Sequence, residues 1–397
     1  MLQLRNQRPL RLFRLLIFGL ISSVWISQIY TGALLWLLPT TDEWLIGEWL
    51  INYQGGFVRR GLPGEIIWRL SQWFTLNPAQ IAIVVQLVVF TTFTFLVYLL
   101  LQATPASVIT FTLLFSPSFL LFSLLSWPMV GVRKEVFLWI IIVGQLLVLR
   151  KAQPPDVFLP WLIGSNTLFA VLSHEMLVIF LPYLLIATVC YEQRFGRLSL
   201  QTTIAMIPAI IAAIIILRAP QATIEAVDAI CTSLGTHAPP SCLDHSQLGS
   251  ITFLTQTVYQ GIQFTRHFTT PETTTVYTIT GLLSFIPPII TIVSYRLWRL
   301  FPPRTLAWIG GLWGSSVAAT ILLFIVAADY GRFVNIHVTC STLILVWLLQ
   351  TSPDLLNTHV RPATGWWPVA ILFVISWRLP MWLKVATFVN AFPWLGW

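Results

Sequence analysis

Residues 14–38 read RLLIFGLISSVWISQIYTGALLWLL, a long run that carries no charge after its first residue. A helix that spans a membrane needs about 20 mostly apolar residues. The run is too long for the apolar core of a secretory signal, and no small-residue cleavage pattern follows it. We therefore interpret it as a retained first transmembrane helix.

The residues that precede this run predict its orientation. They include Arg5, Arg8 and Arg11, and Arg14 opens the run itself. Arginine and lysine beside a span favour the cytoplasmic side of the membrane. The N-terminus is therefore predicted to lie in the cytoplasm.

The rest of the chain has the composition of a membrane protein. Hydrophobic residues make up 56% of the sequence and charged residues only 9%, with a mean hydropathy of +0.80. A soluble domain carries roughly 25% charged residues. We predict an all-α fold, a polytopic transmembrane bundle of about eleven helices that forms one membrane domain over residues 1–397. The predicted spans are 14–38, 81–101, 107–127, 136–149, 157–173, 176–191, 200–217, 276–295, 306–328, 333–349 and 367–383.

Alternation of these spans divides the charges unevenly between the two sides. The predicted cytoplasmic segments, counted together with Arg14 at the cytoplasmic end of the first span, hold 12 of the 22 lysines and arginines. They hold only three of the 14 acidic residues. The net charge of +8 therefore indicates membrane anchoring and gives no sign of nucleic acid binding. The protein is expected to be integral to the plasma (inner) membrane, in contact with membrane lipid.

Two long segments between spans are predicted to lie outside. The segment 39–80 is apolar and rich in tryptophan, which favours helices lying on the membrane surface. The segment 218–275 is polar enough to form a small cap and contains Cys231 and Cys242. An oxidising compartment permits a disulfide between them, and two free thiols are the alternative.

Charged residues beside the spans fall into groups, all on the predicted outer side. Ionisable residues within or beside a membrane are costly and tend to be functional. The shared side therefore predicts one polar site at the outer mouth of the bundle. The groups are Asp42, Glu43 and Glu48; Arg59, Arg60 and Glu65; Arg133, Lys134 and Glu135; His174 and Glu175; Arg266 and His267; and Asp329 and Arg332.

Four of these groups also have a plainer interpretation. The pair Arg59–Arg60 could bind lipid headgroups, and Arg133–Glu135 could be an ordinary loop cap. His174 and Glu175 could pack helices together. Asp329 and Arg332 are three residues apart and could form a local salt bridge.

The residue types predict chemistry on a phosphate. Guanidinium groups pair with phosphate oxygens, a carboxylate can deprotonate a hydroxyl nucleophile, and a His–Glu pair can hold a proton donor or orient a sugar. No glycine-rich nucleotide fingerprint and no P-loop is present. No cofactor is identified, although Asp42, Glu43 and His174 could hold a single divalent cation.

The first outer segment resembles the GT-C superfamily of glycosyltransferases. These polytopic proteins use polyprenyl-phosphate-linked sugars, and many carry an acidic pair soon after the first span, where this chain has TDEWLIGEW at 41–49. The strings YQGGFVRRGLPGE (53–65), RKE, HE and DYGRF also resemble bacterial membrane proteins of polysaccharide synthesis, including polymerase-like ones. Two departures are the Arg59–Arg60 pair and the lack of a large C-terminal soluble domain.

This resemblance implies a role for each group of residues. The catalytic residues would be Asp42, Glu43, His174 and Glu175. The phosphate of the donor would be bound by Arg59, Arg60, Arg133, Lys134 and Arg332. Supporting roles would fall to Glu48, Tyr53, Glu135 and Asp329.

The implied function is extracytoplasmic transfer of a sugar or oligosaccharide from a polyprenyl-(pyro)phosphate donor to a saccharide or glycolipid acceptor. Two other classes of membrane protein would use the same residues differently. A transporter or flippase would bind a lipid-linked or anionic solute with the arginines. A non-catalytic subunit of a polysaccharide assembly complex would use the polar residues as partner contacts.

Overall fold

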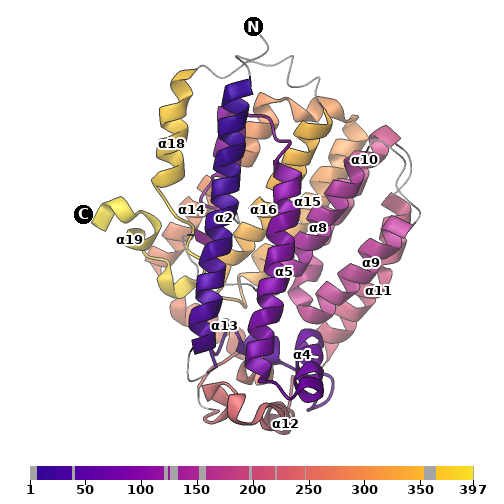
Figure 1. Cartoon of the computed structure of the whole chain (residues 1–397), viewed down its shortest axis with the longest axis vertical. Coiled ribbons are helices and arrows are strands. Elements are labelled where there is room, and N and C mark those ends of the chain that lie inside the picture. The colour runs from indigo at the N-terminus through magenta and orange to yellow at the C-terminus, as the bar shows by residue number, and fades with distance from the viewer. Residues whose placement is uncertain are drawn as a thin grey trace.

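The computed structural model describes residues 7–37, 41–119, 124–125, 133–151, 158–195, 199–219, 221–245, 247–352 and 364–396. Helices form nearly all of the regular structure in these ranges, and no strand occurs in them. The all-α prediction is confirmed for this part of the chain. The helices run mainly along one axis and form a bundle (Figure 1).

Within the described residues, seven helices are long and apolar enough to cross a membrane. Because an α-helix rises 1.5 Å per residue, 20 residues span about 30 Å, the thickness of the hydrocarbon core. The seven spans lie in α2 (Gln7–Leu37), α5 (Pro78–Leu101), η2 (Glu175–Phe180) with α10 (Pro182–Phe195), α11 (Ser199–Arg218), α14 (Pro271–Ser294), α15 (Pro303–Leu323) and α16 (Tyr330–Thr351). Two apolar helices, α8 (Val136–Leu149) and α9 (Phe158–Ser173), are shorter.

Two predicted spans differ from the structure. Within 107–127 the structure has α6 (Val108–Leu114), and parts of the remainder lie outside the described residues. Within 367–383, α18 (Trp367–Ile375) ends well before the predicted boundary. Pro380 cannot continue a helix, and the Arg378 N–H already donates to the carbonyl of Ala391, 2.7 Å away near α19 (Phe388–Ala391).

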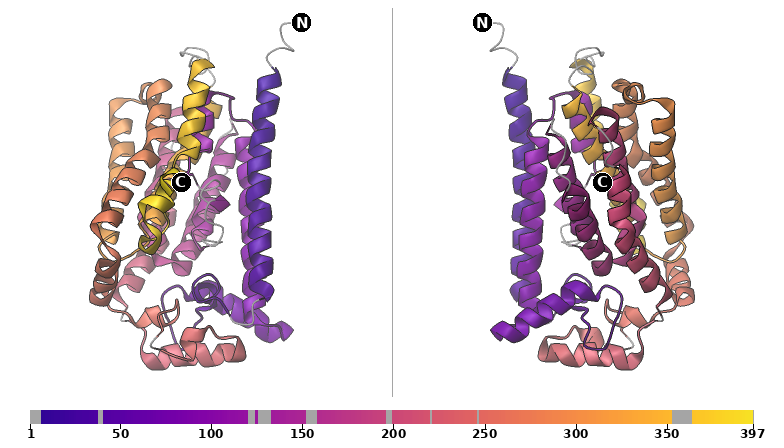
Figure 2. Two further views of the ribbon diagram at one scale, coloured as in Figure 1. Left: turned by 90° about the vertical axis from the view of Figure 1, so that its left-hand side faces the viewer. Right: turned by 90° about the vertical axis from the view of Figure 1, so that its right-hand side faces the viewer.

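Neighbouring helices pack side by side along the bundle axis (Figure 1). Helix α2 lies along α5, and α5 along α8, as Figure 2 shows for the first pair. Helices α9 and α11 pack together, as do α10 and α15, and α14 and α16. Helix α16 is buried along most of its length, whereas α15 is mostly exposed and would face lipid.

Shorter elements cover the end of the bundle opposite the N-terminus (Figure 1). There α4 (Gly61–Phe74) and α12 (Ile224–Leu234) lie across the bundle axis (Figure 2). They are accompanied by α3 (Gly47–Leu50) and α13 (Val258–Phe268). We call the stretch 221–268 the cap.

Candidate ionic site

Close backbone packing shapes the segment between α3 and α4. A Cβ atom on Gly64 would lie 1.9 Å from the carbonyl oxygen of Ile51, and one on Gly61 would lie 2.2 Å from the ring of Tyr53. Glycine at these positions therefore allows α4 to start against the segment that follows α3. Arg60 precedes α4 in the left-handed region, with φ of 67°, which is uncommon for a residue with a side chain.

This backbone brings Arg60 to Glu175, at the start of η2. The Arg60 Nε donates to both carboxylate oxygens at 3.0 and 3.1 Å, and Nη2 donates to one of them at 2.8 Å. The Lys134 ammonium, which precedes α8, donates to the Arg60 carbonyl at 2.8 Å. Three segments far apart in sequence are thus joined at one residue.

Arg332, in the first turn of α16, joins the remaining groups. Its guanidinium pairs with Glu135, donates to Asp329 at 2.7 Å and lies 3.2 Å from His174 Nε2. Glu48 of α3 lies 3.5 Å from the same imidazole nitrogen and 3.4 Å from Arg133. We call this group the ionic cluster: Glu48, Arg60, Arg133, Lys134, Glu135, His174, Glu175, Asp329 and Arg332.

The cluster has a layered distribution of charge. The carboxylates of Glu48, Glu135 and Glu175 are only 3–5% exposed, whereas the side chains of Arg60 and Arg133 are 21% and 15% exposed. Its four cations and four carboxylates balance in number. The three buried carboxylates therefore hold the arginines in place, and the accessible edge of the cluster is formed by Arg60, Arg133 and Asp329, which is 33% exposed.

Burial and neighbouring charge shift the protonation of three members. Burial lowers the pKa of Lys134 to about 8. Burial also lowers the pKa of His174 well below its ordinary value, and Arg60 and Arg332 lower it further. Burial alone would raise the pKa of Glu48, but the surrounding cations, Arg133 first, hold it below the ordinary value. His174 is therefore neutral at pH 7, and Arg332 is the cation of the cluster within hydrogen-bond distance of its ring.

Three buried atoms of the cluster have no hydrogen-bond partner within the described residues. They are Oε1 of Glu48, Oε2 of Glu135 and Nε of Arg133. A buried polar atom without a partner costs about 1–3 kcal/mol. Such atoms are common where a ligand or ordered water completes a site.

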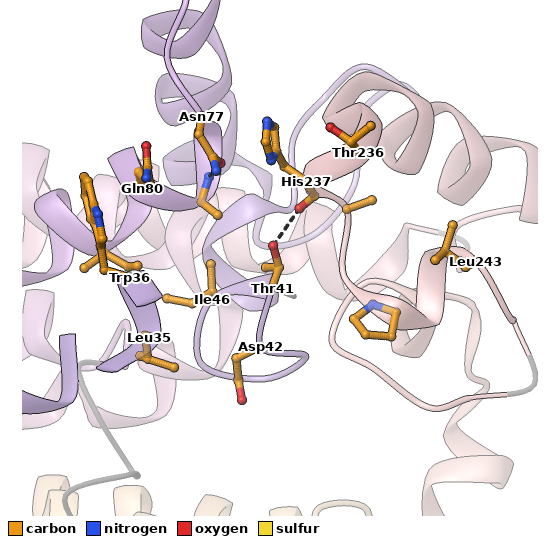
Figure 3. A pocket seen from close by; sticks show the side chains of 14 residues that line it. Leu35, Trp36, Thr41, Asp42, Ile46, Asn77, Gln80, Thr236, His237 and Leu243 are labelled. Atoms are coloured by element: carbon orange, nitrogen blue, oxygen red, sulfur yellow. Dashed lines mark hydrogen bonds between the residues drawn. The ribbon is translucent and has the colours of Figure 1, made fainter. Parts of the chain in front are cut away.

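Asp42 lies outside the ionic cluster and lines a cavity of about 140 Å³. Its Oδ1 accepts the backbone N–H groups of Trp44 and Leu45 at 3.0 and 2.5 Å. Figure 3 shows Asp42 with side chains from α2, α5 and the cap, and the Thr41 hydroxyl donating to the His237 carbonyl at 2.8 Å. The polar side chains that line this cavity are Thr41, Asp42, Asn77, Gln80, Thr236 and His237, beside Trp36.

Glu43 attaches the first segment to the cap. Its carboxylate accepts both the backbone N–H and the hydroxyl of Ser241, and its carbonyl accepts from the Ser250 hydroxyl at 2.7 Å. Cys231 and Cys242 form a disulfide in the structure. The loop that it closes contains residues 236–240, part of the cavity wall. Glu43 therefore positions this wall.

The other predicted residues lie beside the cluster. Arg59 donates to the Phe253 carbonyl at 3.2 Å. The Tyr53 ring stacks on Phe57 with centroids 5.5 Å apart, its backbone N–H donates to Glu65, and burial raises the pKa of its hydroxyl to about 12. No hydrogen bond or ion pair within the described residues links Tyr53, Asp42 or Glu43 to the cluster.

The suggestion of a divalent cation on Asp42, Glu43 and His174 is wrong for this structure. The described residues contain no group of three or more His, Cys, Asp or Glu side chains that could hold a metal ion. The physical reason is that Glu43 bonds the cap and Asp42 bonds its own backbone, while His174 lies within the ionic cluster.

One polar group within the bundle was not predicted from the sequence. His337 of α16 lies 2.8 Å from the Tyr183 hydroxyl through Nδ1 and 2.8 Å from the Thr320 hydroxyl through Nε2. The signal available was a lone histidine in an otherwise apolar span, which is also typical of helix packing.

Comparison with known proteins gives no match to a protein family, to a curated protein or to a solved structure. The resemblance to GT-C glycosyltransferases therefore stays a prediction.

Proposed function

We propose that this protein transfers a sugar or oligosaccharide from a polyprenyl-(pyro)phosphate donor in the synthesis of cell-surface polysaccharide or glycoconjugate. The layered charge of the ionic cluster is the observation that carries the proposal. Arginines at the accessible edge suit a phosphate, because a guanidinium fork pairs with two phosphate oxygens. The buried carboxylates beneath them keep the forks oriented before the donor binds.

The donor would meet the cluster through its phosphate. Arg60 and Arg133, the more exposed cations of the cluster, would contact the phosphate oxygens, and the buried Lys134 would add positive charge behind them. As the bond from the anomeric carbon to the phosphate oxygen breaks, the arginines would stabilise the charge on the leaving phosphate.

The acceptor would occupy the cavity beside Asp42. Because Oδ1 of Asp42 already accepts two backbone N–H groups, Oδ2 can take the proton of an acceptor hydroxyl. The amides of Asn77 and Gln80 and the ring of Trp36 provide the hydrogen bonds and apolar face that a sugar needs. The new bond joins the acceptor oxygen to the anomeric carbon. Helix α3 connects the two regions, since Asp42 precedes it and Glu48 lies on it.

Asp42 provides the direct test of transfer. We expect the Asp42→Asn variant in nanodiscs to release the lipid phosphate or pyrophosphate from lipid-linked sugars about 10²- to 10⁴-fold more slowly, the usual contribution of a general base. The matched control is Asp228→Asn, at an exposed acid of the cap that does not line the cavity. Wild-type turnover in Asp42→Asn would contradict the assignment. Binding of donors without turnover by the unaltered protein would favour a non-catalytic subunit, and movement of the lipid between leaflets would favour a flippase.

The proposed site faces the extracytoplasmic side, with the N-terminus in the cytoplasm. Single cysteines at Phe57 and Leu243, both well exposed at the capped end, should react in intact cells with a reagent that does not cross the membrane. A cysteine at exposed Trp298, at the other end, should react only after the cells are opened. The background would lack Cys190 and Cys340, which are buried free thiols. The reverse labelling pattern would place the site in the cytoplasm.

Donor binding should depend on pH through Lys134. Because burial lowers the pKa of this lysine to about 8, its positive charge is present below pH 8 and is lost as pH rises through that value. We therefore expect the affinity for the anionic donor to fall severalfold between pH 7 and pH 9. The Lys134→Gln variant should bind more weakly at pH 7 and lose this dependence. A pH profile that is the same in both proteins would show that Lys134 is not the titrating group.

A further inference from the structure

A second cavity, of about 340 Å³, lies at the end of the bundle opposite the cap. It is formed by three segments: Arg14 and Ile17 of α2, the end of α5 with Tyr98 and Gln102, and Arg150 at the end of α8. Helix α5 packs against both α2 and α8, so the cavity occupies the point where the three meet. None of the residues of the proposed transfer site lines it.

The charge that lines this cavity is uncompensated among the described residues, unlike that of the ionic cluster. Two arginines line it, and no acidic residue of the described ranges does. Arg150 is held by the backbone, because Nη1 donates to the Leu99 carbonyl at 3.1 Å. Arg14 is exposed and makes no ion pair or hydrogen bond within the described residues. By contrast, Arg60, Arg133 and Arg332 each face a carboxylate.

The surroundings of the cavity favour a lipid over a free ion. Ile17 and Tyr98 form an apolar wall, and the neighbouring side chains Leu15, Leu16 and Phe18 of α2 are exposed on a helix that would face the hydrocarbon core. An acyl chain could lie along α2 while the phosphate reaches both guanidinium groups. Basic pockets between transmembrane helices are known to bind anionic headgroups.

We propose that the cavity between α2, α5 and α8 binds the phosphate of an anionic phospholipid through Arg14 and Arg150. The glycerol part of the headgroup would lie near the Gln102 amide. The bound lipid would fill the junction of the three helices and hold the first span against the bundle. This proposal does not depend on the transfer function.

Native mass spectrometry of the full chain can count bound lipids during titration with phosphatidylglycerol or phosphatidylcholine. We expect tighter binding of phosphatidylglycerol to the unaltered protein. Loss of one charged hydrogen-bond donor should weaken that binding about tenfold in Arg14→Gln and in Arg150→Gln. The control Arg304→Gln removes an exposed arginine at the start of α15 and should bind as the unaltered protein does.

The titration has outcomes that would overturn the proposal. Equal binding of the two lipids would show that the anionic headgroup is not recognised, and an equal loss in Arg304→Gln would show attraction by general surface charge. Either result would overturn the proposal. Displacement of the lipid by millimolar inorganic phosphate would assign the cavity to a free anion instead. Arg14 is exposed, so Arg14→Gln should keep the fold and remains informative if Arg150→Gln does not.

Discussion

Replacing Arg332 with leucine is expected to lower the free energy of unfolding by about 3–5 kcal/mol, because it leaves a buried carboxylate without its partner. Glu135 is 3% exposed and pairs with Arg332, so water cannot hydrate it when the guanidinium is removed. Asp329 also pairs with Arg332 but is 33% exposed and can be hydrated. Unfolding in mixed micelles with increasing denaturing detergent would measure the change.

A second substitution distinguishes the cost of leaving Glu135 unpaired from the cost of removing the Arg332 side chain. In Arg332→Leu with Glu135→Leu, neither charge remains buried, and replacement of a whole ion pair by apolar groups is often neutral. We therefore expect the double variant to recover much of the stability. The control Arg69→Leu removes an arginine that is 59% exposed and pairs with Glu65, and it should cost less than about 1 kcal/mol. Equal losses in Arg332→Leu and Arg69→Leu would contradict the importance of burial.

The sequence predicted the long spans well and the short helices poorly. Spans such as Pro78–Leu101 and Tyr330–Thr351 follow from an unbroken apolar run, because lipid requires a full helical length. The predicted spans over 107–127 and 367–383 rested on composition alone. Hydropathy does not show that a chain turns back on itself, as the described residues do after Ile375. The total of about eleven spans therefore stays a prediction.

The candidate site was predicted in part because charge beside a span is rare. Glu48, Arg133, His174, Glu175 and Arg332 were chosen on that basis, and the structure brings them together. The sequence could not show that Asp42 and Glu43 would separate from this group. The partner of the Glu43 carboxylate, Ser241, is 198 residues away in the chain and belongs to a loop with no distinctive pattern, while Asp42 bonds its own backbone neighbours.

Replacing Arg60 with lysine should impair donor binding while keeping the fold, and this result would separate the two roles of the residue. Arg60 uses Nε and Nη2 to hold Glu175, and its Nη1 makes no hydrogen bond within the described residues. A lysine offers one ammonium, which can pair with Glu175 or with a phosphate but lacks the rigid fork that reaches both.

Backbone strain does not complicate this comparison. Lysine and arginine both carry a Cβ atom, so both should bear the same cost of the left-handed φ of 67° that precedes α4. We expect Arg60→Lys to lose less stability than Arg332→Leu, since a charged partner for Glu175 remains. Loss of the hydrogen bond to phosphate should weaken donor binding roughly 10- to 150-fold.

The companion variant Glu175→Gln tests whether the carboxylate positions the guanidinium. Removing its charge leaves Arg60 present but less firmly oriented, so donor binding should weaken less than in Arg60→Lys. Titration of a polyprenyl-phosphate-linked sugar into each protein, with unfolding measured on the same samples, gives both readouts. If Arg60→Lys binds donor normally, the residue serves only as the partner of Glu175. If binding and stability fall together, Arg60 is structural, and the phosphate contact must then be assigned to Arg133, the other arginine at the accessible edge of the cluster.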